Sequence, residues 1–153
     1  MVSLEMGIAV AVGLAATAED LTRRTISNWL PLTALAGGVV CQCLEKGWKG
    51  AAAAGAGAAS GFGVFLVFYL LGGMGGGDVK LMAGFGALLG FSRLLEAAFW
   101  TALVGGLLAV AAISVVALRG KFGKATGEQR PLAAIPYAPA IVAGVWITLL
   151  STP

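Results

Sequence analysis

The chain has 153 residues, of which 59% are hydrophobic and 11% are charged, and its mean hydropathy is +0.93. Average soluble domains carry roughly 25% charged residues, so this composition indicates an integral membrane protein. The formal net charge of +3 is small, and its basic residues are scattered, which argues against nucleic-acid binding. The chain has no histidine, and Cys41 and Cys43 give only half a metal site, so we expect no metal.

Six hydrophobic segments follow one another along the chain, and polar turns separate them. They are Val2–Ala18, Trp29–Leu44, Ala51–Leu71, Leu81–Phe91, Ala97–Leu118 and Leu132–Leu150. A helix that spans a bilayer needs ~20 residues, so the fourth segment, which would rise only ~16 Å, is either a short span or a re-entrant hairpin. Glu5 in the first segment is close enough to the end of the chain to reach the interface. Pro136 and Pro139 predict a kink in the sixth segment.

The basic residues favour six crossings over five. With six crossings, the turns at 19–28, 72–80 and 119–130 share one side and carry seven of the ten Lys and Arg residues, and the opposite side carries the other three. This asymmetry obeys the positive-inside rule and places the N-terminus outside, whereas removing the fourth crossing would export the basic 119–130 loop. We therefore predict an all-α integral membrane protein, a single domain over residues 1–153, with six transmembrane helices of which the fourth is short.

Only two aspartates occur in the chain, and each lies where a hydrophobic segment meets a polar turn. Asp20 follows the first segment, and Asp78 precedes the fourth. Because two crossings separate them, they must face the same side of the membrane. Two adjacent carboxyl groups share one proton, and such a pair can activate water for peptide hydrolysis. Asp20 and Asp78 are therefore the candidate catalytic residues of an intramembrane aspartyl protease.

The glycine run before Asp78 predicts an adaptable loop, because four glycines in five positions make a poor helix. A phosphate-binding loop would need Gly-Lys-Ser/Thr after a soluble strand, but here Lys80 follows Val79 and precedes Leu81. Nucleotide binding is therefore not favoured.

Each aspartate lies in a stretch that matches a known motif. The stretch Gly76-Gly77-Asp78-Val79-Lys80-Leu81 and the stretch from Asp20 to Asn28 resemble the G-x-G-D-x-K-L-x-A motif and the first aspartate motif of the type IV prepilin peptidases, which are GxGD aspartyl proteases of the membrane. The stretch from Ile135 to Ala140 is similar to the last-helix signature of short Tad/Cpa-type members. The resemblance implies that Asp20 and Asp78 form the catalytic dyad, and the further motif positions are Gly76, Gly77, Lys80, Arg24 and Asn28.

The resemblance also implies a function. It implies a multi-pass protease of the bacterial inner membrane that cuts the leader peptides of Flp-type prepilins and pseudopilins at the cytoplasmic face, with no cofactor. Homo-oligomerisation stays open. Ser27 stands where many relatives have proline, which is expected to soften the turn. The chain lacks the C-x-x-C-containing domain of larger bifunctional members, so N-methyltransferase activity is not expected.

The surroundings of the two aspartates allow alternatives. Arg23 and Arg24 are expected to be interfacial anchors, and Lys80 either tunes Asp78 or extends toward the lipid headgroups. Glu19 is interpreted as a solvated interfacial carboxylate. A small transporter or proton pathway is the alternative function, because intramembrane aspartates often serve ion movement. Against this, both aspartates lie at segment ends. A presenilin-like protease would use the same dyad on a longer chain.

Overall fold

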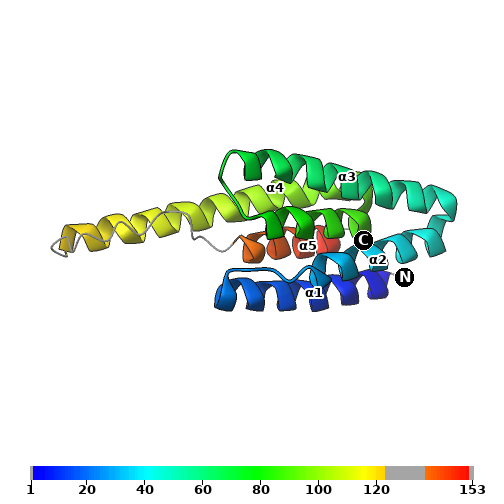
Figure 1. Cartoon of the computed structure of the whole chain (residues 1–153), viewed down its shortest axis with the longest axis horizontal. Helices are drawn as coiled ribbons and strands as arrows, with labels where there is room; N and C mark the ends of the chain where they lie inside the picture. The colour runs from blue at the N-terminus through cyan, green and yellow to red at the C-terminus, as the bar shows by residue number, and fades with distance from the viewer. Residues whose placement is uncertain (1, 123–136, 152–153) are drawn as a thin grey trace.

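The structure is a computed structural model that describes residues 2–122 and 137–151, and over this part of the chain it is all-helical. The helices pack side by side and run alternately in opposite directions (Figure 1). They are α1 (Val2–Arg23), α2 (Trp29–Lys46), α3 (Trp48–Leu70), α4 (Gly76–Phe122) and α5 (Ala138–Ser151). The second part of α4 extends beyond the other helices (Figure 1). The all-α prediction is confirmed.

Helix α4 is interrupted at Gly90, whose φ of 71° and ψ of 172° are not helical. Residues with a side chain rarely adopt such a positive φ, so glycine suits this break. The chain reverses there, and the two parts of α4 lie beside each other (Figure 1). The break therefore separates the predicted fourth and fifth segments. The helical part of the fourth segment, however, begins at Gly76 rather than Leu81.

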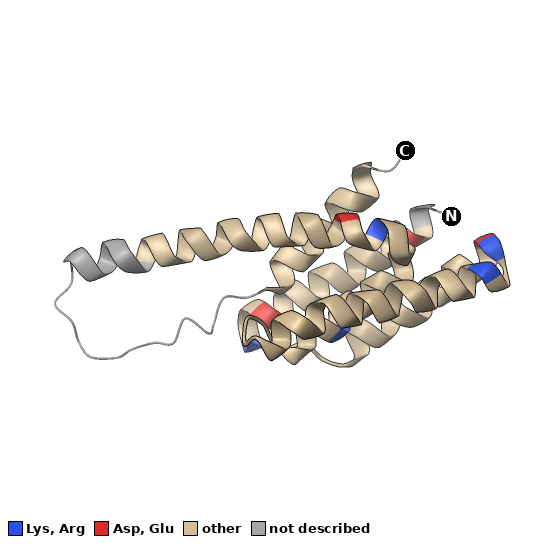
Figure 2. Ribbon diagram, turned by 90° about the horizontal axis from the view of Figure 1, so that it is seen from above, with Lys and Arg blue, Asp and Glu red and all other residues tan. Residues whose placement is uncertain are grey.

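Two of the described helical regions are long and apolar enough to cross a membrane. They are Trp48–Leu70, with 23 residues, and Gly76–Val115, with 40 residues, which contains the break at Gly90. Few positions along the described helices are Lys, Arg, Asp or Glu (Figure 2). Large apolar side chains are exposed on the outer surface, among them Trp29, Trp48 and Leu70. A surface of this kind suits a lipid environment better than water.

The first part of α4, which carries Asp78, lies at the centre of the bundle. Its Leu81, Met82, Phe85 and Leu88 are fully buried. Glycines let the neighbouring backbones approach it closely: a Cβ atom on Gly57 of α3 would overlap the carbonyl oxygen of Gly86, and one on Gly38 of α2 would overlap the backbone of Ala87 and Leu88. Such small-residue contacts are typical of helix packing in membranes. The central helix is therefore held from two sides by backbone contact.

Two buried polar side chains from other helices contact α4, one just before and one just after the break at Gly90. Gln42 of α2 is 1% exposed and donates from Nε2 to the carbonyl oxygen of Leu88, at 3.2 Å. Glu5 of α1 is also 1% exposed, and its Oε2 lies 3.5 Å from Nη1 of Arg93. The carboxylate of Glu5 is therefore enclosed by the protein near the end of the bundle. A buried carboxylate needs a partner, and Arg93 provides it inside the bundle.

The start of α5 corrects the predicted sixth segment. The helix begins at Ala138, so Pro139 lies in its first turn, where a proline has no helical hydrogen bond to break. The kink predicted at Pro139 is therefore wrong. Pro136 and the beginning of the predicted segment lie outside the described residues.

Candidate active site

The structure brings Asp20 and Asp78 to the same end of the bundle, where α1 ends and where α4 and α5 begin (Figure 1). Asp20 is 8% exposed and Asp78 is 6% exposed, so both carboxyl groups are buried. They are close enough for the charge of Asp20 to act on Asp78. Two segments 58 residues apart in sequence therefore place their only aspartates in one buried site.

Asp20 joins the end of α1 to the start of α5. Its Oδ2 accepts a hydrogen bond from the backbone N–H of Ala138, at 3.1 Å. In the same turn, the N–H groups of Ala140 and Ile141 donate to the carbonyl oxygen of Tyr137, and Pro139 has no N–H. The backbone N–H of Ala138 therefore has no acceptor within the first turn of α5. The carboxylate of Asp20 accepts its hydrogen bond instead.

The turn after Asp20 is set by Arg24, a predicted motif position. Arg24 adopts a φ of 53°, and its backbone N–H donates to the carbonyl oxygen of Asp20, at 3.0 Å. A left-handed residue with this hydrogen bond is a common way to end a helix, although glycine is the usual residue there. The side chain of Arg24 is exposed. Arg24 therefore contributes to the site through its backbone.

Asp78 is the third residue of α4. Its Oδ2 accepts a hydrogen bond from the backbone N–H of Gly75, at 3.1 Å, and its own backbone N–H donates to the carbonyl oxygen of Gly75. This reciprocal pairing resembles a capping box and explains why the helix begins inside the glycine run. The predicted loop therefore covers Gly72 to Gly75, and the last two glycines of the run, Gly76 and Gly77, are already helical. The Oδ1 of Asp78 is buried and has no hydrogen-bond partner within the described residues.

The two glycines before Asp78 have different neighbours. A Cβ atom on Gly77 would lie 3.1 Å from Cβ of Ile26, which belongs to the loop between α1 and α2. At Gly76 the nearest atom would be Cε2 of Tyr69, at an ordinary 3.6 Å. The loop that follows Asp20 therefore crosses the start of α4 at Gly77, whereas Gly76 has room for a side chain.

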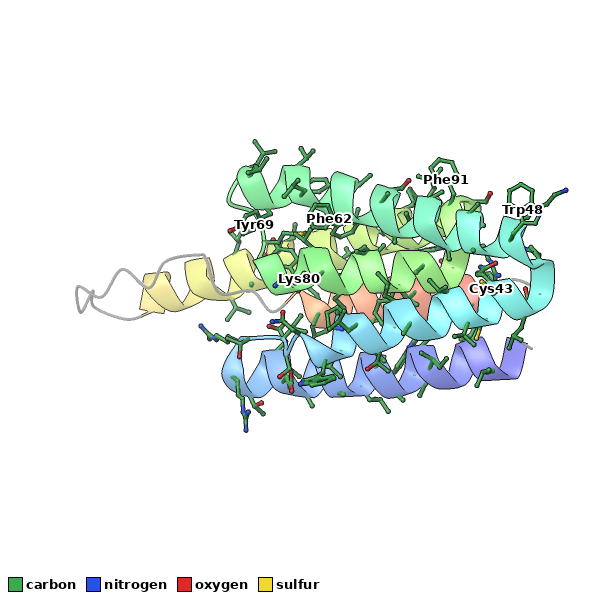
Figure 3. The ribbon with its side chains drawn as sticks, turned by 45° about the vertical axis from the view of Figure 1, so that its right-hand side comes forward. Cys43, Trp48, Phe62, Tyr69, Lys80 and Phe91 are labelled. Carbon is green, nitrogen blue, oxygen red and sulfur yellow. The ribbon has the colours of Figure 1, made fainter. Side chains whose placement is uncertain are left out.

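Lys80 and Asn28 connect the same loop to α4. The Nζ of Lys80 donates to Oδ1 of Asn28, at 3.0 Å, and the side chain of Lys80 lies at the same end of the bundle as Tyr69 (Figure 3). Lys80 follows Asp78 by two residues, and Asn28 is the residue before α2. The two predicted motif positions therefore contact each other and hold the loop against the helix that carries Asp78.

A second pair shapes the loop and was missed from the sequence. The carboxylate of Glu19 accepts hydrogen bonds from the backbone N–H and the hydroxyl of Ser27, at 2.7 Å and 2.9 Å. These bonds hold the pKa of this exposed carboxyl below its usual value. Proline at position 27 could not donate either bond. Ser27 therefore fixes the turn through Glu19 rather than softening it. The serine in place of proline at position 27 was the sequence feature that could have indicated this pair.

The geometry suits acid–base chemistry. Two buried carboxyl groups lie at the same end of the bundle, each with one oxygen held by a backbone N–H, and the Oδ1 of Asp78 stays free of protein donors within the described residues. Within residues 2–122 and 137–151 no group of three or more His, Cys, Asp or Glu side chains could hold a metal ion. The groups at hand can therefore bind water between two carboxyls and transfer protons.

Comparison with known proteins identifies the family. The model of the type IV leader peptidase family matches residues 7–110, which include both aspartates. A prepilin leader peptidase/N-methyltransferase of Bacillus subtilis (strain 168) is 42% identical over 90 residues, which are 58% of this chain and 32% of that protein. The matched stretch thus spans about a third of the relative's length. No solved structure matches. The chain belongs to the type IV leader peptidase family, a family of membrane proteases.

Proposed function

We propose that this protein is an aspartyl endopeptidase of the bacterial inner membrane that removes the leader peptide of Flp-type prepilins and pseudopilins at the cytoplasmic face. The observation that carries the proposal is the pair of buried carboxyl groups at one end of the bundle, one on α1 and one on α4. Family membership supports the substrate class, since the Bacillus relative is a prepilin leader peptidase.

The chemistry follows from two carboxyl groups that share one proton. The ionised aspartate takes a proton from a water molecule as the water oxygen attacks the scissile carbonyl, and the protonated aspartate donates its proton to the carbonyl oxygen. The resulting tetrahedral intermediate then loses the amine, which leaves with a proton returned by the dyad. The Oδ1 of Asp78 has no protein partner among the described residues, so it is the oxygen available to this water.

The remaining motif positions frame the dyad rather than react. Lys80 and Asn28 hold the loop after Asp20 against α4, and Gly77 lets that loop approach. The backbone of Arg24 turns the chain out of α1, and Gly76 begins α4. These contacts keep the relative position of the two carboxyls fixed, which electrostatic preorganisation requires.

The proposal predicts a specific cut. Incubated in detergent with a prepilin, the purified full chain is expected to yield one new N-terminus at the leader junction, read by mass spectrometry. With S-adenosylmethionine added as methyl donor, the same spectrum reports whether that N-terminus carries a methyl group, which we do not expect. The matched control is a prepilin with a substituted residue at the junction, which should stay intact. An intact wild-type prepilin, under conditions where the enzyme stays folded, would contradict the proposed activity.

We also propose six crossings with both termini outside, so that the dyad and residues 119–130 are cytoplasmic. The basic asymmetry of the turns supports this topology, and the break at Gly90 allows two crossings within α4. In a background with Cys41 and Cys43 replaced by alanine, Thr22→Cys and Lys124→Cys should both react with an impermeant thiol reagent only from the cytoplasmic side. Labelling of position 124 from outside, with position 22 labelled from inside, would remove the fourth crossing.

A further inference from the structure

An ion pair between a buried carboxylate and a partly exposed guanidinium lies at the end of the bundle opposite the dyad and has no part in the proposed chemistry. Glu5 of α1 is 1% exposed and Arg93 of α4 is 25% exposed, and Glu5 Oε2 lies 3.5 Å from Arg93 Nη1. The other oxygen of Glu5 has no hydrogen-bond partner in the described part of the chain. A buried pair of this kind contributes little net stability relative to apolar residues of similar volume, so stability alone does not explain it.

Glu5 and Asp20 lie on the same face of α1. They begin and end a stripe of buried residues at helical spacing, which consists of Glu5, Ala9, Val12, Ala16 and Asp20. The two carboxylates are separated by about four turns, or ~22 Å along the helix. Because a helix is stiff over this length, any rotation or sliding of α1 that displaces Glu5 also displaces Asp20.

Between these two ends, α1 is tied to α5, because Trp146 Nε1 donates to the carbonyl oxygen of Ala9 at 3.2 Å. Ala9 and Ala16 are fully buried but small, and Gly13 lies against Val142 and Trp146 of α5. Along its length, α1 packs mainly on α5 and α2 rather than on α4. Direct contact between α1 and α4 is therefore sparse, and the Glu5–Arg93 pair is a direct polar link between the two helices.

Arg93 lies three residues after the break in α4. Before the break, Gln42 holds the end of the helix that carries Asp78 through the carbonyl oxygen of Leu88. After the break, Glu5 holds the next part of α4 through Arg93. The ion pair thus connects the helix of Asp20 to the turn that ends the helix of Asp78.

We propose that Glu5 and Arg93 are positioning residues that fix the register of α1 against α4, so that Asp20 meets Asp78 at the other end of the bundle. The inference rests on the proposed function. A charged pair serves this role because it is satisfied in only one relative position of the two helices, whereas an apolar pair tolerates sliding.

The test compares two double variants of the full chain in lipid nanodiscs. Glu5→Met/Arg93→Met keeps the side-chain volume without the charges, and Glu5→Arg/Arg93→Glu restores a pair with the charges exchanged. For the apolar variant we expect a kcat for prepilin cleavage about 10²-fold below wild type, as a misplacement of about 1 Å can produce, with unchanged KM and unfolding midpoint. The charge-exchanged variant should recover most of the kcat.

A second measurement, cysteine cross-linking, tests the relative position of α1 and α4 and does not depend on cleavage activity. In a background with Cys41 and Cys43 replaced by alanine, Asp20→Cys/Asp78→Cys should form an oxidative cross-link, and adding Glu5→Met/Arg93→Met should slow it at least several-fold. If wild type fails to cleave prepilin, the proposed function fails and the cross-link alone decides this inference. Wild-type kcat or an unchanged cross-linking rate in the apolar variant would overturn it. A kcat loss that only follows a lower unfolding midpoint, without recovery on charge exchange, would do the same.

Discussion

Asp20→Asn and Asp78→Asn are each expected to lower prepilin cleavage by at least about 10²–10⁴-fold, the usual contribution of one positioned acid or base. Asparagine has nearly the shape of aspartate, and its amide oxygen can still accept the hydrogen bond from Ala138 or Gly75. The side chain can no longer share a proton with its partner, so neither water activation nor protonation of the carbonyl oxygen can proceed. The initial rate of cleavage, read by mass spectrometry, measures the effect.

The control must remove a carboxylate without affecting the dyad. Glu96→Gln serves this purpose, because Glu96 is exposed and its nearest polar contact is the hydroxyl of Ser151, on α5, at 3.3 Å. We expect wild-type turnover from this variant and unchanged unfolding midpoints from all three. Turnover near the wild-type rate in either purified asparagine variant would remove the dyad from the mechanism.

The pairing of the two aspartates could be predicted because it depends on topology alone. Two helices that run in opposite directions, α2 and α3, lie between Asp20 and Asp78 in the chain, so both aspartates come to the same end of the bundle (Figure 1). The contacts that hold them were not predictable in the same way. Asp20 accepts a hydrogen bond from Ala138 because the N–H of Ala138 has no acceptor within the first turn of α5. Which N–H lacks an acceptor depends on the residue at which the helix begins. Sequence periodicity does not fix helix ends to one residue.

The ion pair at the other end was not predicted, for a related reason. Glu5 and Arg93 are far apart in sequence, and each alone fits an interfacial residue, so only their contact shows a buried pair. Gln42 did carry a signal, since it is a lone amide within the apolar segment Trp29–Leu44. Its partner, the carbonyl oxygen of Leu88, becomes available only because α4 breaks at Gly90.

The glycines of α3 offer a second large effect with a matched control on the same helix. A Cβ atom on Gly57 would overlap the carbonyl oxygen of Gly86, and one on Gly86 would overlap that of Gly57, so neither helix can relax by moving a flexible side chain. Two residues away, a Cβ atom on Gly55 would meet nothing within 4 Å. The two positions thus share a helix and a residue type but differ in their surroundings.

Gly57→Ala is therefore expected to destabilise the protein by about 1–3 kcal/mol, because α3 must move away from the helix that carries Asp78. Gly55→Ala should leave the stability unchanged or raise it by up to about 1 kcal/mol, since alanine favours a helix over glycine. Unfolding midpoints in matched detergent measure both changes, and prepilin cleavage should fall only in Gly57→Ala, because its displacement reaches Asp78. Equal midpoints for the two variants would show that the backbones of α3 and α4 do not touch at Gly57 and Gly86.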